Sequence, residues 1–264
     1  MPRLSLESWI DALQARGRYT FLREEAVRDS GLSATAVRKA LQRAVKSGRL
    51  VRPKEYFFVI VPLEYRSAGG PPPSWFVADL MAAMRLPYYV ALLSAAAIHG
   101  AAPQPPQEFQ VMTDRTVRSI RVGRSHIRFF ASRYLQRAAT LQVKTPTGSM
   151  RVSSPETTVI DLVRFAKAAG HLDYVAAVIA ELAPRLNAGR LLAALKVVSD
   201  VPNAQRLGYI LDVLRKRRLS KAVHGWVKSR IERPQPLRPG RPVTGAREDR
   251  RWRLWINGPV EVEA

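Results

Sequence analysis

Polar and apolar residues follow a helical period along residues 23–54, which read REEAVRDSGLSATAVRKALQRAVKSGRLVRPK. The pattern predicts a short helix that ends at Gly31, where a left-handed residue can close it. Ser33 then occupies an N-cap position, because its hydroxyl can accept an otherwise unpaired backbone N–H. In the second helix, apolar side chains recur at i, i+3, i+4 and i+7 and predict a stripe that faces a core. The stripe consists of Val37, Ala40, Leu41 and Ala44.

The same spacing turns the polar side chains of the second helix outward. Thr35, Arg38 and Gln42 share one exposed face, and Lys39, Arg43 and Lys46 flank it. A helix, a short Gly-containing turn and a basic second helix are typical of a helix-turn-helix. Gly48 ends the second helix, and RLVRPKEYFFVIV predicts two strands around Pro53-Lys54, a basic wing to which Tyr19-Thr20-Phe21 adds an edge. Residues 1–62 are therefore predicted to be a winged helix-turn-helix that binds DNA.

The alternatives for this segment are a solvated helical hairpin and a winged helix that contacts only protein. DNA binding is favoured because the basic face lies opposite the apolar stripe. Arg can then contact guanine O6 and N7, and Gln adenine N6 and N7, while Lys and Arg on the flank and wing contact phosphates. The candidate DNA-binding residues are Ser33, Thr35, Arg38, Lys39, Gln42, Arg43 and Lys46 on the helix, and Arg52 and Lys54 on the wing.

The remaining pattern predicts a mixed α+β domain. Leu4–Ala15 reads as a first helix capped by Ser5, and residues 63–73, LEYRSAGGPPP, read as a linker. Residues 74–264 then form the second domain, whose C-terminal part is helical. Its first predicted elements are a helix after Ser74, a helix from Pro87 to Gly100, strands at 108–112, 119–122 and 126–131, and a hairpin of 141–144 with 150–152. A helix from Ser154 follows, with Ile160, Val163 and Phe165 in its core. The chain then continues with four helical pieces over 171–227, broken near Pro184, Pro202 and Arg217, a loop at 234–245 and a strand at 251–257.

Composition and charge narrow the possible partners. The chain of 264 residues is 47% hydrophobic and carries a net charge of +22, which favours anionic partners, nucleic acid first. Residues 1–62 supply +6 of this charge and the remainder +16, so the second domain touches DNA or an acidic partner, or presents a solvated basic surface. Asp11 interrupts the apolar N-terminus, and the longest apolar run, Tyr88–Ile98, is shorter than the ~20 residues of a membrane helix. We expect a cytoplasmic protein.

Candidate catalytic and metal-binding residues are few. The absence of cysteine excludes disulfides and thiol chemistry, and the four histidines lack metal-ligand spacing. His99 is expected to bond a terminal carbonyl or fill the core, and Ser153 and Ser154 to act in capping. Asp114, Asp161 and Asp173 could meet as ligands in a nuclease, but Arg164 one turn after Asp161 favours an ion pair. We predict no enzyme activity, no cofactor and no metal.

Four stretches of the second domain, taken in order behind the winged helix, resemble a known family. They are YYVALLSAAAIHGAA, FQVMTDRTVRSIRVGRSHIRFF, KTPTGSMRVSSPETTVIDLVRF and AQRLGYILDVL. The sequence is similar to the AbiEi-type antitoxins of bacterial abortive-infection toxin–antitoxin systems. The resemblance runs from the winged helix to about Leu214, and more loosely to RWRLWIN near the C-terminus.

The resemblance implies a type IV antitoxin that counteracts a nucleotidyltransferase-like toxin encoded by a neighbouring gene. It further implies autorepression through inverted repeats in the promoter, with DNA bound by the first domain and antitoxicity carried by the second. It does not settle whether antitoxin and toxin touch. The competing interpretation is a winged-helix transcriptional regulator whose second domain senses a ligand or makes a dimer. In that case YYVALLSAAAIHG could line a ligand pocket, but the small residues of this stretch favour a close-packed core helix.

Overall fold

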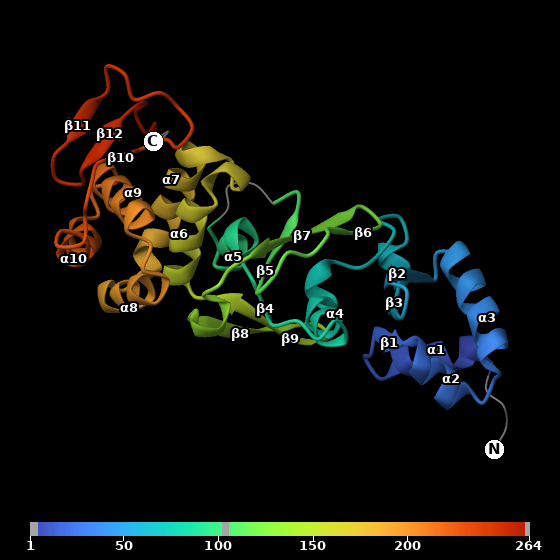
Figure 1. The fold of residues 1–264 in the computed structure, drawn as a ribbon. Coiled ribbons are helices and arrows are strands. Elements are labelled where there is room, and N and C mark those ends of the chain that lie inside the picture. The colour runs from blue at the N-terminus through green and yellow to red at the C-terminus, as the bar shows by residue number, and fades with distance from the viewer. Residues whose placement is uncertain (1–4, 102–105, 262–264) are drawn as a thin grey trace. The chain divides into compact units, whose positions relative to one another are not determined.

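The computed structural model describes residues 5–101 and 106–261. Mixed α+β architecture is confirmed, with an N-terminal part of helices and strands and a helical C-terminal part (Figure 1). The chain divides into two compact units. The first comprises Met1–Tyr89, Gln107–Arg133 and Gln142–Arg151, and the second comprises Val90–Pro106, Tyr134–Leu141 and Val152–Ala264. The three-part division of the chain around residues 63–73 stays a prediction.

The N-terminal elements of the first unit have the order and pairing of a winged helix-turn-helix. They are α1 (Leu6–Ala15), β1 (Thr20–Leu22), α2 (Arg23–Ser30), α3 (Ala34–Lys46), β2 (Leu50–Lys54) and β3 (Phe57–Ile60). The three strands form an antiparallel sheet in the order β1-β3-β2, so the predicted edge strand is confirmed. Ser5 accepts a hydrogen bond from the Ser8 backbone and caps α1 as expected. Leu4, the expected start of that helix, lies outside the described residues.

The turn of the wing lies two residues later than the sequence predicts. β2 runs through Pro53 and Lys54, and the chain reverses at Glu55-Tyr56. Proline lacks the N–H that a regular ladder requires, so the sequence favours a turn at this position. The register shifts between Val51 and Lys54, and this irregularity accommodates Pro53 inside the strand.

Aromatic rings hold the core of the winged part together. Trp9 of α1 meets Phe21 of β1 edge to face with ring centroids 5.0 Å apart, and Phe21 stacks on Phe58 of β3 at 5.5 Å. All three side chains are buried. Ring pairs of this kind stabilise a fold by more than the burial of their apolar surface alone. They attach α1 to the sheet through β1 and β3.

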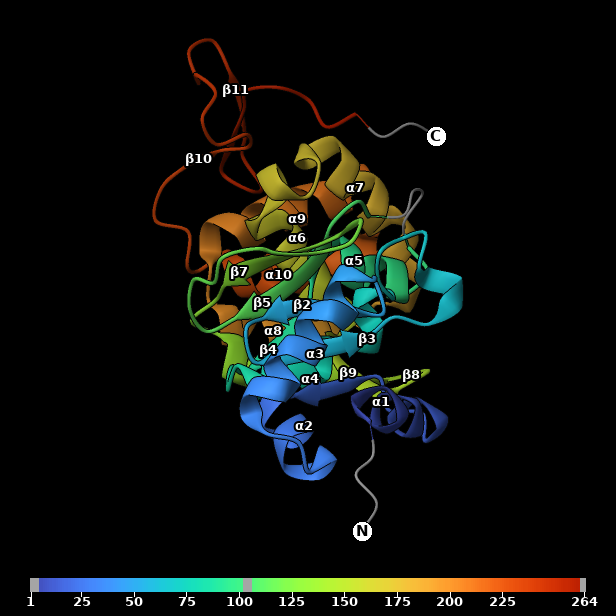
Figure 2. The same ribbon diagram turned by 90° about the vertical axis from the view of Figure 1, so that its right-hand side faces the viewer.

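A six-stranded sheet follows, in the order β6-β7-β5-β4-β9-β8. Its strands are β4 (Tyr88–Val90), β5 (Phe109–Thr113), β6 (Ile120–Val122), β7 (Ser125–Ala131), β8 (Thr140–Thr145) and β9 (Gly148–Ser153). The predicted strands and the β8–β9 hairpin are confirmed. β6 and β7 form an antiparallel hairpin, whereas β5 pairs with β7 in parallel and not with β6, its neighbour in sequence. β5 and β7 lie side by side in both views (Figure 1 and Figure 2).

The predicted helix from Pro87 to Gly100 is wrong in its first part. Tyr88–Val90 is a buried strand, and the helix that follows, α5, covers only Leu92–Ile98. Two tyrosines and a valine are strong strand formers, and their burial inside a sheet outweighs the helical period of the small residues after them. The helix after Ser74 is also shorter than expected, because Pro73–Trp75 is a 3-10 turn and α4 begins at Val77 and ends at Ala83.

The second unit is built around one buried helix. α6 (Pro155–Arg164) is buried from Glu156 to Val163 and packs against α5 and three later helices. The four helical pieces are confirmed as α7 (His171–Leu182), α8 (Ala188–Val198), α9 (Val201–Val213) and α10 (Arg217–Val227). Ile160 and Val163 are buried as predicted, but Phe165, which ends α6, is only half-buried.

A small sheet at the C-terminus contains the predicted last strand. Its order is β10-β12-β11, with β10 (Gln235–Pro236), β11 (Arg247–Asp249) and β12 (Leu254–Ile256). The predicted loop at 234–245 therefore contains one two-residue strand. The segment is docked on α9 through Trp252, which is fully buried, donates from Nε1 to the Asp212 carboxylate at 2.6 Å, and offers its carbonyl to Gln205 Nε2 at 2.7 Å.

The approach of Trp252 to α9 depends on the absence of a side chain at Gly208. A Cβ at Gly208 would lie 2.1 Å from the indole ring, which is far inside van der Waals contact. We therefore predict that Gly208→Ala lowers the free energy of unfolding by about 1–3 kcal/mol, the usual cost of overpacking. Gly225→Ala in α10 is the matched control, since a Cβ there meets nothing within 4 Å. This control should gain about 0.5–1 kcal/mol, because alanine favours a helix over glycine. Urea unfolding followed by tryptophan fluorescence measures both, and equal midpoints for the two variants would contradict the packing argument.

Candidate nucleic-acid interface

Helix α3 has the N-cap at its start and the buried apolar stripe along one side that the sequence predicts. Gly31 ends α2 in the left-handed conformation at φ 66°, and the Ser33 hydroxyl accepts from the Ala36 backbone N–H at 3.2 Å. Val37 and Leu41 are buried in the core of the winged part, and Ala40 and Ala44 pack against that core. The orientation of α3 about its own axis is therefore set by the apolar stripe.

The polar residues of α3 lie on its exposed side. Every candidate residue of this helix is exposed: Ser33, Thr35, Arg38, Lys39, Gln42, Arg43 and Lys46. Arg52 of the wing is exposed as well, whereas Lys54 is half-buried at the end of β2. The candidate residues of α3 are thus exposed on the side of the helix away from the core, as predicted. Their role in DNA binding stays a prediction.

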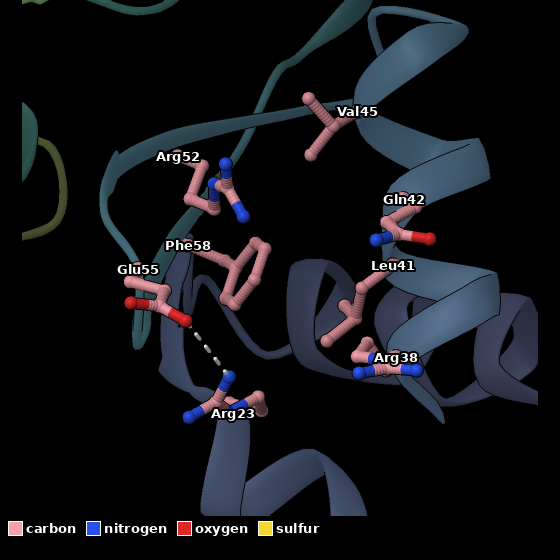
Figure 3. A pocket seen from close by; sticks show the side chains of 8 residues that line it. All are labelled: Arg23, Arg38, Leu41, Gln42, Val45, Arg52, Glu55 and Phe58. Atoms are coloured by element: carbon pink, nitrogen blue, oxygen red, sulfur yellow. Dashed lines mark ion pairs between the residues drawn. The ribbon is translucent and has the colours of Figure 1, made fainter. Parts of the chain in front are cut away.

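A groove runs between α3 and the wing (Figure 3). It brings together three of the predicted residues, Arg38, Gln42 and Arg52. The other candidate residues do not line it. Its full lining is Arg23, Arg38, Leu41, Gln42, Val45, Arg52, Glu55 and Phe58. Leu41 and Phe58 are buried and Val45 half-buried, so apolar side chains lie beneath the charged ones.

Sequence reasoning missed two charged residues of this groove. Arg23, the first residue of α2, and Glu55, at the turn of the wing, form an ion pair with 3.7 Å between the guanidinium nitrogen and the carboxylate oxygen. The Arg23 backbone N–H also donates to the carbonyl of Tyr56 at 2.9 Å. The two residues are far apart in sequence, and no spacing rule joins them. The one signal for Glu55 in the sequence is its negative charge, because the other charged residues of the wing are basic.

A second hollow with many cations lies in the second unit, where α9 meets α10. Its lining is Asp212, Arg215, Arg217, Ser220, Lys221 and Arg251. The single carboxylate there, Asp212, already accepts from Trp252 Nε1 and from the Ser220 hydroxyl, and Arg251 lies 3.4 Å away. The hollow accounts for part of the positive charge of the second domain. Contact of this surface with DNA or an acidic partner stays a prediction.

The residues considered for chemistry have structural partners. His99 is buried, and its Nε2 donates to the Ser153 carbonyl at 2.7 Å, so it bonds a strand carbonyl within the core. Ser154 caps α6 by accepting from the Thr157 backbone at 3.2 Å. Asp161 pairs with Arg164 at 2.9 Å as predicted. Over residues 5–101 and 106–261, no group of three or more histidine, aspartate or glutamate side chains is placed to hold a metal ion.

Among the helices of the described part of the chain, none combines the length and apolar character needed to span a membrane.

Comparison with known proteins defines the class of the chain. Residues 89–213 match the AbiEi antitoxin C-terminal domain. The chain also shares its fold with the crystal structure of the RV2827C protein from Mycobacterium tuberculosis, at a TM-score of 0.68 and 13% identity over 93% of this chain and 89% of that one. No curated protein matches the sequence closely.

The chain is thus a mixed α+β protein, and its residues 89–213 are similar to an antitoxin domain. The resemblance to the AbiEi-type antitoxins is confirmed over residues 89–213, and this family indicates an antitoxin role in a toxin–antitoxin system. At 13% identity, the likeness to the mycobacterial protein shows a common fold and nothing of its function.

The cap of α3 generates a prediction for stability. Ser33→Ala removes the hydroxyl that accepts the Ala36 N–H, so it should lower the free energy of unfolding by about 1 kcal/mol. Ser33→Asn keeps an acceptor at the same position and should cost much less. Urea unfolding of the two variants measures the difference. The capping role would be refuted if Asn destabilised the protein as much as Ala.

Proposed function

We propose that this protein is the antitoxin of a type IV toxin–antitoxin system, which counteracts a nucleotidyltransferase-like toxin and represses its own operon. The observation that carries the proposal is the match of residues 89–213 to the AbiEi antitoxin C-terminal domain. The protein acts by binding and not by catalysis, and it works in the cytoplasm, where both promoter DNA and a toxin acting on cellular substrates are found.

The proposed autorepression rests on the geometry of α3. A helix whose polar face is wholly exposed, beside a basic wing, is suited to the major groove of DNA. Thr35, Arg38 and Gln42 would face the bases of inverted repeats in the promoter. The flanking cations Lys39, Arg43 and Lys46, with Arg52 and Lys54 of the wing, would contact phosphates and set the register of the helix.

The alternative function, a regulator whose second domain senses a ligand, draws less support from the structure. The helix that this alternative would need for a ligand pocket, α5, has Leu92, Ala95 and Ala96 fully buried, in line with the core role favoured for it. It packs against α6 as part of the core of the second unit.

The base-reading role assigned to Arg38 is open to direct measurement. Arg38→Ala should remove about 1–3 kcal/mol of discrimination between the promoter repeats and random DNA, because a bidentate contact to guanine is lost. Fluorescence anisotropy with both DNA duplexes at one salt concentration measures this loss. An equal loss on promoter and random DNA would show that Arg38 contacts only the backbone.

Lys54 should behave differently, because a phosphate contact carries no sequence information. Lys54→Ala is expected to weaken binding to all sequences alike and to reduce the salt dependence of log K by about one phosphate contact, a slope change of ~0.9. A titration series from low to physiological salt measures the slope. A loss confined to the promoter sequence would contradict the assignment.

The antitoxin role is tested in cells. The neighbouring nucleotidyltransferase-like gene is expressed from an inducible promoter, with and without the full-length chain supplied from a second, unrelated promoter. Growth should stop in the first case and resume in the second, because the match to the AbiEi antitoxin C-terminal domain supports an antitoxin role. A neighbour that leaves growth unchanged, or a growth arrest that the chain does not relieve, would overturn the proposal.

A further inference from the structure

The groove between α3 and the wing contains one negative side chain among its positive ones. Arg23, Arg38 and Arg52 line it together with the carboxylate of Glu55. In Figure 3, Glu55 faces Arg23 across the end of the groove, at the ion-pair distance of 3.7 Å. A carboxylate in this position opposes the binding of any phosphate that enters the groove.

The fold places Arg23 and Glu55 together through the backbone. The Arg23 N–H donates to the Tyr56 carbonyl at 2.9 Å, so the turn of the wing is attached to the first residue of α2. A cation at the N-terminus of a helix is disfavoured by the helix dipole, and Arg23 gains nothing there from the helix itself. Its guanidinium is available for an anion, and Glu55 is the anion that the free protein supplies.

This ion pair is easily broken. The side chains of Arg23 and Glu55 are 42% and 78% exposed, and an exposed pair at 3.7 Å contributes little to stability. A DNA phosphate, which presents several acceptor oxygens to a guanidinium, can therefore take the place of the carboxylate.

We propose that Glu55 is a specificity-determining residue, which competes with DNA phosphate for Arg23 in the groove between α3 and the wing. The inference rests on the proposed function, since it concerns how the same surface binds DNA. DNA of random sequence is bound by the flanking cations of α3, Lys39, Arg43 and Lys46, and leaves the Arg23–Glu55 ion pair intact. On a promoter repeat, base contacts draw α3 deeper into the major groove, the DNA backbone enters the groove beside the wing, and a phosphate displaces Glu55 from Arg23.

The experiment compares salt dependence on promoter and random duplexes for the full-length chain and for Glu55→Gln. Each phosphate contact adds ~0.9 to the slope of log K against log salt. In Glu55→Gln, Arg23 is free to contact phosphate on any DNA. The slope on random DNA should therefore steepen by about 0.9, the slope on promoter DNA should stay unchanged, and the ratio of promoter to random affinity should fall several-fold.

Two further comparisons separate this effect from a simple change of net charge. Glu24→Gln removes a carboxylate that is exposed and adjacent to Arg23 in sequence but does not line the groove. It should change both slopes alike and only slightly. In an Arg23→Gln background, Glu55→Gln should have no more effect than Glu24→Gln, because the residue that Glu55 competes for is gone. Thermal melting verifies that each variant is folded.

Two outcomes would overturn the inference. If Glu55→Gln shifts promoter and random DNA equally, or if its effect persists without Arg23, Glu55 is only a surface charge, and the proposed repressor function still stands. If the wild-type chain itself binds promoter repeats no better than random DNA, the repressor function and this inference fail together. A steeper slope confined to random DNA, and abolished by Arg23→Gln, supports the inference.

Discussion

The burial of Val37 and Leu41 is the constraint on which the proposed interface depends. Both side chains are almost completely buried in the core that Trp9, Phe21 and Phe58 complete. Because residues on a helix are related by a fixed angle, locking these two positions inward turns the polar positions of α3 outward. The direction of the proposed base-reading residues follows from hydrophobic packing, and the basic residues themselves contribute little to it.

The wing is held by a different interaction, the backbone hydrogen bond between Arg23 and Tyr56. This bond joins the start of α2 to the turn of the wing, next to Arg23 and Glu55 of the groove. Packing thus orients α3, and a backbone contact positions the wing opposite it. The similarity to the AbiEi antitoxin C-terminal domain covers residues 89–213, a stretch that includes α6, the buried helix of the second unit.

Much of the winged part was predictable because its signals are local. Gly31 and Ser33 end one helix and begin the next through their own backbone and side-chain chemistry, and the stripe of α3 is a repeat within one helix. The errors arose where distant parts of the chain decide the outcome. Tyr88–Val90 is a strand because a sheet surrounds it, and the Arg23–Glu55 pair exists only because β3 pairs with β1 and brings the turn back to α2.

The most direct test of the proposed function measures repression and antitoxicity separately in one cell. The triple variant Arg38→Ala, Gln42→Ala and Arg43→Ala removes exposed side chains of α3 and leaves its buried stripe intact. A reporter driven by the operon's own promoter is measured beside growth during toxin expression. The account predicts that this variant loses repression and still restores growth as the wild type does. Loss of both activities, or retained repression, would contradict the assignment of DNA binding to α3 and of antitoxicity to the other domain.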